Sequence, residues 1–169
     1  MCSKARETKR EHFMYLCLAV GTGMRPFEIL KITPMMLDYS YKQGLFIEGK
    51  QGKERVVPLH DALYSELKAY ISEMKIRKTE TLFSFQDRTI RRFVKRYASE
   101  VGVSEHLQKD IKPYTFRHYF NTIMRKNKID DQIRKMIVGH NLDYSEGYVH
   151  IEWEEQLTAV NSVFKAIPL

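Results

Sequence analysis

The spacing of apolar residues changes from helical to strand-like between Leu45 and Leu59. Residues 44–48 and 55–59 carry the apolar and β-branched side chains of short strands, and the segment between them, Gly-Lys-Gln-Gly-Lys, is typical of a tight turn. The pattern predicts a β-hairpin. Because the flanking segments follow helical spacing, we expect a mainly α fold with a small antiparallel sheet, in the α+β class.

Apolar residues at intervals of three and four predict helices along most of the remaining chain. The first covers about residues 8–20 as an amphipathic helix that Gly21 and Gly23 end, and the second opens at Arg25 and Pro26. Gly139 is expected to cap a helix over residues 131–137, and residues 101–110 are expected to form a loop. The other predicted helices cover about residues 61–74, 88–97, 115–124 and 154–167.

The charge of the chain favours an anionic partner. A length of 169 residues with 43% hydrophobic and 29% charged residues suits a single domain with its own core. The formal net charge of +7 is typical of proteins that bind nucleic acid, although a merely basic surface would give the same value.

Targeting and metal signals are absent from the sequence. The two cysteines, Cys2 and Cys17, fit neither a zinc motif nor a disulfide framework, and Cys17 is expected to pack as a small apolar residue. No apolar stretch approaches the ~20 residues that span a bilayer, and the N-terminus lacks the apolar core of a signal peptide. We therefore expect no metal, no cofactor and no membrane, and a location in the host cytoplasm, on the nucleoid when DNA is bound.

The segment between Pro113 and His150 carries an arginine, histidines and a tyrosine in an order that suits phosphoryl transfer. Arg117 could bind a phosphate through two parallel hydrogen bonds, His140 could donate another, and the phenol of Tyr148 could attack phosphorus once deprotonated. None of these steps needs a metal ion.

Further cations lie upstream of that segment. Arg25 follows a glycine-rich turn at a helix N-terminus, and Lys50 and Lys53 lie in the predicted hairpin turn. A basic stripe follows one face of the helix over residues 88–97. Its members are Arg88, Arg91, Arg92, Lys95 and Arg96. Such a stripe could contact DNA phosphates, although a solvated charged face is the commoner reason for a charge run.

With these motifs in this order, the chain resembles the catalytic domain of the tyrosine recombinases of the phage-integrase family, over about residues 21–150. The resemblance implies that fold and site-specific cleavage and rejoining of double-stranded DNA through a 3′-phosphotyrosyl intermediate, without a cofactor. It implies catalytic roles for Arg25, Lys50, Tyr114, Arg117, His140 and Tyr148. It also makes Lys53 and Arg55 expected DNA contacts, with the basic stripe.

Within the resemblance, Tyr148 would be the nucleophile and Lys50 the general acid, with Tyr144 and Lys53 as competing candidates. Tyr114 stands where the family usually has a histidine, a departure found among archaeal virus and plasmid integrases. Glu28, one helical turn beyond Arg25, is expected to orient the site.

The resemblance also bears on the organisation of the chain. We expect residues 1–169 to be one catalytic domain from the C-terminal part of a longer integrase that self-associates into a synaptic tetramer on DNA. The tail over residues 151–169 either folds back on its own core or is exchanged between protomers. The alternatives are a type IB topoisomerase-like strand transferase and a non-catalytic DNA-binding module.

Overall fold

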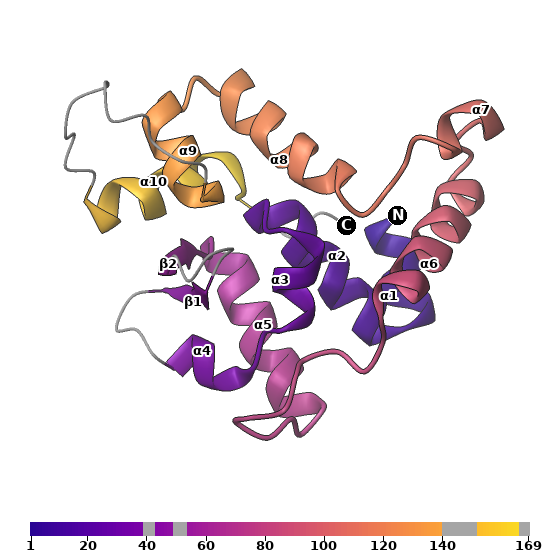
Figure 1. The fold of residues 1–169 in the computed structure, drawn as a ribbon, viewed down its shortest axis with the longest axis horizontal. Coiled ribbons are helices and arrows are strands. Elements are labelled where there is room, and N and C mark those ends of the chain that lie inside the picture. The colour runs from indigo at the N-terminus through magenta and orange to yellow at the C-terminus, as the bar shows by residue number, and fades with distance from the viewer. Residues whose placement is uncertain (39–42, 49–53, 140–151, 166–169) are drawn as a thin grey trace.

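The computed structural model describes residues 1–38, 43–48, 54–139 and 152–165. Its elements succeed one another along the chain as Figure 1 shows. In order they are α1 (Cys2–Thr8), α2 (Arg10–Thr22), α3 (Pro26–Leu30), α4 (Pro34–Asp38), β1 (Gly44–Glu48), β2 (Glu54–Pro58), α5 (Asp61–Glu73), α6 (Asp87–Glu100), α7 (Glu105–Gln108), α8 (Thr115–Lys126), α9 (Asp131–Val138) and α10 (Trp153–Val163).

The predicted hairpin is present. β1 and β2 pair antiparallel in a two-stranded sheet, with Leu45 opposite Val57 and Glu48 opposite Glu54. Leu45 and Val57 are fully buried, so the inner face of the sheet joins the core. The predicted class, mainly α with a small antiparallel sheet, is confirmed.

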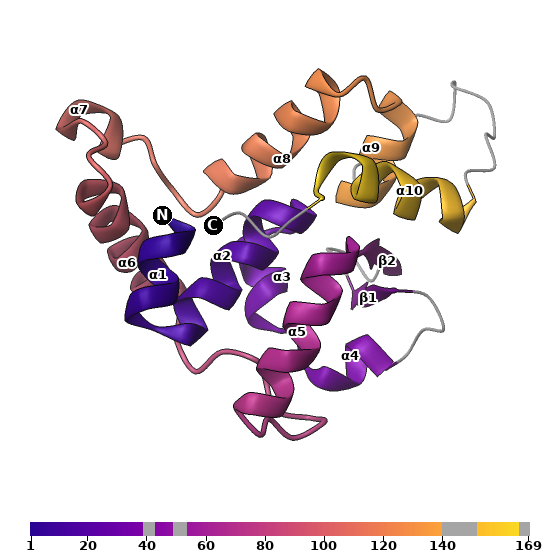
Figure 2. The same cartoon turned by 180° about the vertical axis from the view of Figure 1, so that it is seen from behind.

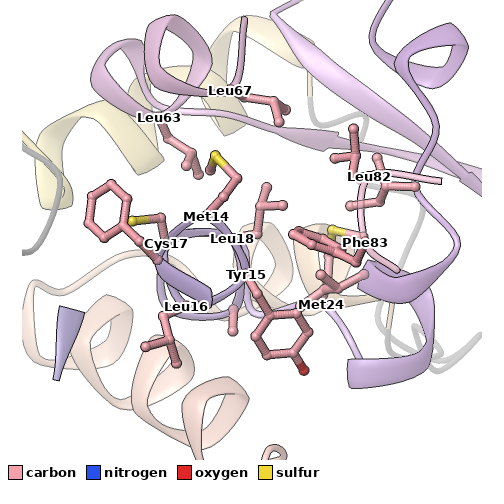
Figure 3. Packing of buried hydrophobic residues seen from close by; sticks show 14 of the residues in the cluster. Met14, Tyr15, Leu16, Cys17, Leu18, Met24, Leu63, Leu67, Leu82 and Phe83 are labelled. Atoms are coloured by element: carbon pink, nitrogen blue, oxygen red, sulfur yellow. The ribbon is translucent and has the colours of Figure 1, made fainter. Parts of the chain in front are cut away.

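Helix α2 is the centre of the larger core. The predicted helix is present, but every residue from Glu11 to Thr22 is buried, so it is covered on all sides and is not amphipathic as the spacing predicted. Figure 3 shows side chains of α2 packed against Leu63 and Leu67 of α5 and against Phe83.

The end of α2 agrees with the prediction at Gly23 but not at Gly21. Gly21 lies inside the helix, where a Cβ atom would approach Leu63 Cδ2 to 2.9 Å, so its absence of a side chain permits close packing on α5. The helix ends one residue later, at Thr22, and Gly23 forms its C-cap with a φ of 62°.

A second core lies under α8, α9 and α10. Its buried members are Phe120, Met124, Ile137, Val138, Ala159, Val160 and Phe164. The rings of Phe164 and Phe120 stack at 5.3 Å between centroids, nearly parallel. Residues 152–165 thus pack on their own chain, and the exchange of the tail between protomers stays a prediction.

Three short helices were not predicted. α1 buries Cys2 and Ala5 against the larger core, while α4 and α7 contain five and four residues. A helix of one turn shows too few apolar positions to reveal a period, which explains why α7 was predicted as part of a loop.

The hairpin, α9 and α10 lie on one side of the molecule, and α6 and α7 lie on the other, with α2 and α3 between them (Figures 1 and 2). Among the described helices, none is both long enough and apolar enough to cross a bilayer.

Candidate active site

Arg25 lies at the N-cap of α3, as predicted, and is tied to Glu28. Its backbone N–H donates to Glu28 Oε2 at 2.7 Å, and its Nη1 donates to Glu28 Oε1 at 3.1 Å. The side chain of Arg25 remains 24% exposed. Pro26 at the first helical position needs no N–H partner, so the sequence suits the start of a helix here.

Arg117 lies in the first turn of α8 and is almost fully buried, with 1% of its surface exposed. Its Nη1 donates to the backbone oxygen of Gly23 and its Nη2 to that of Val138, each at 2.7 Å. The guanidinium therefore joins the C-terminal ends of α2 and α9, where helix carbonyls carry partial negative charge.

Glu28 also pairs with Arg55 of β2. Arg55 Nη1 and Nη2 donate to the two carboxylate oxygens at 3.1 and 2.9 Å, and Arg55 Nε donates to the backbone oxygen of Ile137 at 3.3 Å. Burial alone would raise the pKa of Glu28, but the hydrogen bonds from Arg55 and Arg25 and the charge of Arg55 outweigh it and hold that pKa below its usual value.

Arg117 lies within electrostatic reach of the other two arginines. Burial lowers the pKa of Arg117, and the positive charges of Arg25 and Arg55 lower it further, while Glu28 acts in the opposite direction. We call Arg25, Glu28, Arg55 and Arg117 the arginine cluster. Arg25 and Arg55 share Glu28, and Arg55 and Arg117 bind the adjacent backbone oxygens of Ile137 and Val138. The catalytic roles expected of Arg25 and Arg117 stay predictions.

Tyr114 occupies the N-cap of α8 and is 42% exposed. Its ring meets that of His118 edge-on at 5.0 Å between centroids, and its backbone oxygen accepts a hydrogen bond from the Arg117 backbone N–H at 3.1 Å. The structure thus brings Tyr114 to the edge of the arginine cluster.

The remaining predicted catalytic residues lie outside the described residues. They are Lys50, His140 and Tyr148, together with the competing candidates Lys53 and Tyr144 and with His150. Their roles stay predictions.

The basic stripe of α6 is exposed along its length and does not join the arginine cluster, because α6 lies across the molecule from the hairpin (Figure 1). Arg91 pairs with Asp87 at 2.7 Å and Arg96 with Glu100 at 3.4 Å, both within the helix.

Two features of the cluster could have been found in the sequence. Arg55 shares a strand face with Val57, two residues on, which is buried, so strand alternation points Arg55 inward. Arg117 shares a helix face with Phe120 and Met124, both fully buried. The spacing of Glu28 from Arg25 was visible in the sequence, but its pairing with Arg55 had no sequence signal, because that ion pair joins distant segments.

The part of the chain that the structure describes holds no group of three or more His, Cys, Asp or Glu side chains placed to bind a metal ion. The fold and the arginine cluster define a basic α+β domain whose site suits an anionic ligand.

Comparison with known proteins identifies the family. The profile of the phage integrase family matches residues 1–154, and the chain belongs to that family. A tyrosine recombinase of Pseudothermotoga lettingae is 27% identical over 164 residues, which cover 94% of this chain and 56% of that protein. The chain spans about half the length of the curated relatives it matches.

Solved structures share the fold. The integrase of mycobacterium phage Brujita matches 93% of this chain and 53% of its own, with a TM-score of 0.70 and 17% identity. The XerH site-specific recombinase, solved in a pre-cleavage complex with its difH substrate, matches 92% of this chain and 46% of its own, with a TM-score of 0.63 and 25% identity.

Proposed function

We propose that the chain is the catalytic part of a site-specific DNA recombinase that cleaves and rejoins strands through a 3′-phosphotyrosyl intermediate. The observation that carries this proposal is the arginine cluster of a phage integrase family fold, in which Glu28 and the end of α9 link Arg25, Arg55 and Arg117 from distant segments. Preorganised cations of this kind stabilise charge that develops on phosphate oxygens.

In the proposed reaction, the phenolate of Tyr148 attacks the phosphorus and the bond from phosphorus to the 5′ oxygen breaks. Lys50 protonates the departing oxygen as general acid, and His140 and Tyr114 donate hydrogen bonds to the phosphate. A 5′-hydroxyl of a second strand then displaces the tyrosine and restores a phosphodiester, so no external energy source is needed.

Arg25 and Arg117 have different parts in this proposal. Arg25 is the more exposed guanidinium and is the one that contacts the non-bridging oxygens. Arg117 is almost fully buried. It adds positive charge near the phosphate-binding position of Arg25, and its hydrogen bonds fix the ends of α2 and α9.

We also infer that the basic stripe of α6 contacts DNA phosphates and that the protein self-associates on DNA. Arg88, Arg92 and Lys95 are exposed at helical spacing on one line of α6, whereas Arg91 and Arg96 face acidic partners on the same helix. The recombinase XerH is described as bound to its DNA substrate, which supports DNA as the partner here.

A covalent trapping experiment tests the proposal. The purified chain is incubated with nicked DNA duplexes that carry a randomised segment, so that the short cleaved strand diffuses away and the protein–DNA adduct persists under denaturing conditions. We expect wild type to form an adduct whose peptide, mapped by mass spectrometry, carries the nucleotide on Tyr148. Tyr148→Phe should form none, Tyr144→Phe should react normally, and Arg25→Ala should react on the order of 10²–10³-fold more slowly.

Other outcomes reject the proposal. DNA binding without any adduct would indicate a non-catalytic module, and an adduct on Tyr144 would reassign the nucleophile. Relaxation of supercoiled plasmid by a monomer, without enrichment of any sequence from the randomised library, would indicate a topoisomerase.

A further inference from the structure

The guanidinium of Arg55 is occupied by the protein itself. Nη1 and Nη2 bind the two oxygens of Glu28 at 3.1 and 2.9 Å, and Nε binds the Ile137 backbone oxygen at 3.3 Å. Only 12% of the side chain is exposed, and the Glu28 carboxylate is fully buried. All three nitrogens of this arginine thus have protein partners, which is unlike an arginine that waits for a phosphate.

Arg55 also lies against the end of α9. Gly139 caps this helix with a φ of 68°, and a Cβ atom there would come within 3.0 Å of the Cδ, Nε and Cζ atoms of Arg55. Ile137 and Val138 offer the last carbonyls of α9 to Arg55 and Arg117 respectively. Two cations therefore hold this helix end, and His140 follows Gly139 directly in the sequence.

Glu28 is shared unequally between two arginines. Arg55 binds it through two side-chain hydrogen bonds, while Arg25 donates one from its side chain and is twice as exposed, at 24% against 12%. A bidentate pair is the stronger arrangement. Arg25 can therefore turn to a phosphate while Arg55 keeps the buried Glu28 charge paired.

The charges of the cluster agree with separate roles for Arg55, which pairs with Glu28, and Arg25, which binds the phosphate. Arg25, Arg55 and Arg117 carry three positive charges and Glu28 carries one negative charge. Without Arg55, Glu28 would pair with Arg25 alone, and a buried carboxylate that loses its partner is costly. Arg25 would then be held by Glu28 and be less available to an incoming phosphodiester.

We propose that Arg55 is a positioning residue of the recombination site and not a DNA contact: it keeps Glu28 paired, leaves Arg25 available to the phosphate, and fixes the end of α9. This inference rests on the proposed function. It replaces the expectation from the sequence that Arg55 binds DNA.

The test separates binding from reaction for Arg55→Gln. Binding to a short duplex is measured by fluorescence anisotropy at several salt concentrations, and the rate of adduct formation is measured at saturating DNA. We expect the slope of log affinity against log salt to stay at the wild-type value. The rate at saturating DNA should fall on the order of 10²-fold, because the reacting groups are misplaced. The pKa of Glu28, followed by NMR, should rise.

Matched substitutions provide the controls. Arg92→Gln, on the exposed stripe of α6, should reduce the steepness of log affinity against log salt by about 0.9, as expected for one lost phosphate contact. Arg77→Gln, at an exposed position paired with Glu80, should change neither the slope nor the rate. Arg55→Lys keeps the charge but not the two-pronged geometry, so it should stay slow. If thermal unfolding shows that Arg55→Gln does not fold, Arg55→Lys replaces it in the same binding and rate measurements.

Two results would overturn the inference. In the first, Arg55→Gln reduces the steepness of log affinity against log salt by about 0.9 and reacts at the wild-type rate at saturating DNA. Arg55 would then be a phosphate contact. The second is full activity of Arg55→Lys. If wild type forms no adduct, the proposed function itself fails, and the salt slope and the Glu28 titration still decide whether Arg55 touches DNA or holds Glu28.

Discussion

His60 is almost fully buried at the N-terminal end of α5, with 1% of its surface exposed. Its Nδ1 accepts a hydrogen bond from the Leu63 backbone N–H at 3.4 Å, which leaves the proton on Nε2. Nε2 has no partner among the described residues. Burial lowers the pKa of His60 from 6.5 to about 4, so the fold favours the neutral ring.

This shift predicts loss of stability in acid. The unfolded chain binds a proton near pH 6.5 and the folded chain only near pH 4, so the free energy of unfolding should fall as pH drops through that window. The His60 contribution is on the order of 3 kcal/mol. Urea denaturation at pH 7 and at pH 4.5 measures it.

The control for this measurement is His60→Asn, which does not titrate and should show a smaller difference between the two pH values. Part of the residual dependence should come from His12, whose pKa burial also lowers to about 4, and part from Glu11 and Glu28, whose pKa values lie below the usual carboxyl value. An equal pH dependence in wild type and His60→Asn would show that His60 is not the group responsible.

At the scale of the elements, the C-cap of α2 is tightly constrained. Gly23 has a φ of 62°, and a Cβ atom there would come within 2.5 Å of Phe120 Cδ1 on α8. Gly23→Ala should therefore add a steric clash to the strain of a left-handed residue, and lower the free energy of unfolding by about 2–4 kcal/mol.

Gly102→Ala separates the two effects. Gly102 has a φ of 78°, but an added Cβ would have no neighbour within 4 Å, so this substitution should cost only the backbone strain of about 1–2 kcal/mol. Denaturant titrations of both variants give the comparison. Equal losses would mean that Phe120 moves aside and the approach of α8 to α2 is loose.

The elements also show how far the sequence predicts the fold. The hairpin and the helices from α5 to α10, apart from α7, follow from apolar spacing, turn residues and the Gly139 cap. The burial of α2 on every side does not, because periodicity reports one apolar face and the remaining faces are covered only in the assembled core.

The site is less predictable than the fold. Motif order assigned Arg25 and Arg117 to one site, and in the structure Glu28, Arg55 and the end of α9 link them. Their catalytic roles stay predictions. The sequence did not reveal that Arg55 pairs with Glu28 or that Arg117 binds backbone oxygens, because those contacts join segments distant in the chain. Lys50, His140 and Tyr148 lie outside the described residues, and their roles rest on the family's motifs.

At the scale of the whole molecule, α10 closes the second core of its own chain. It contacts α8, α9 and β2, and Phe164 stacks on Phe120 and on His60. If α10 packs in this way in free protein, thermal unfolding should not depend on protein concentration over about a hundredfold range, because no second chain takes part.

Substitution of Phe164 measures how much the packing of α10 on its own chain contributes to the free energy of unfolding. Phe164→Ala should lower the free energy of unfolding by about 3 kcal/mol, since it removes a buried ring. Glu154→Ala, at an exposed position of the same helix, should have little effect. An unfolding midpoint that rises with protein concentration in wild type and not in Phe164→Ala would instead indicate an exchanged tail.

The bonds from Arg117 to the main chain have a genetic consequence. Its acceptors are the peptide oxygens of Gly23 and Val138, which every amino acid possesses, so no substitution at those two positions can create a replacement partner. A suppressor screen that starts from Arg117→Ala should therefore yield reversion to arginine at position 117 and no compensating substitution at Gly23 or Val138. The pairing of Arg55 with Glu28 joins two side chains, and its loss can in principle be repaired by a compensating change at the other member.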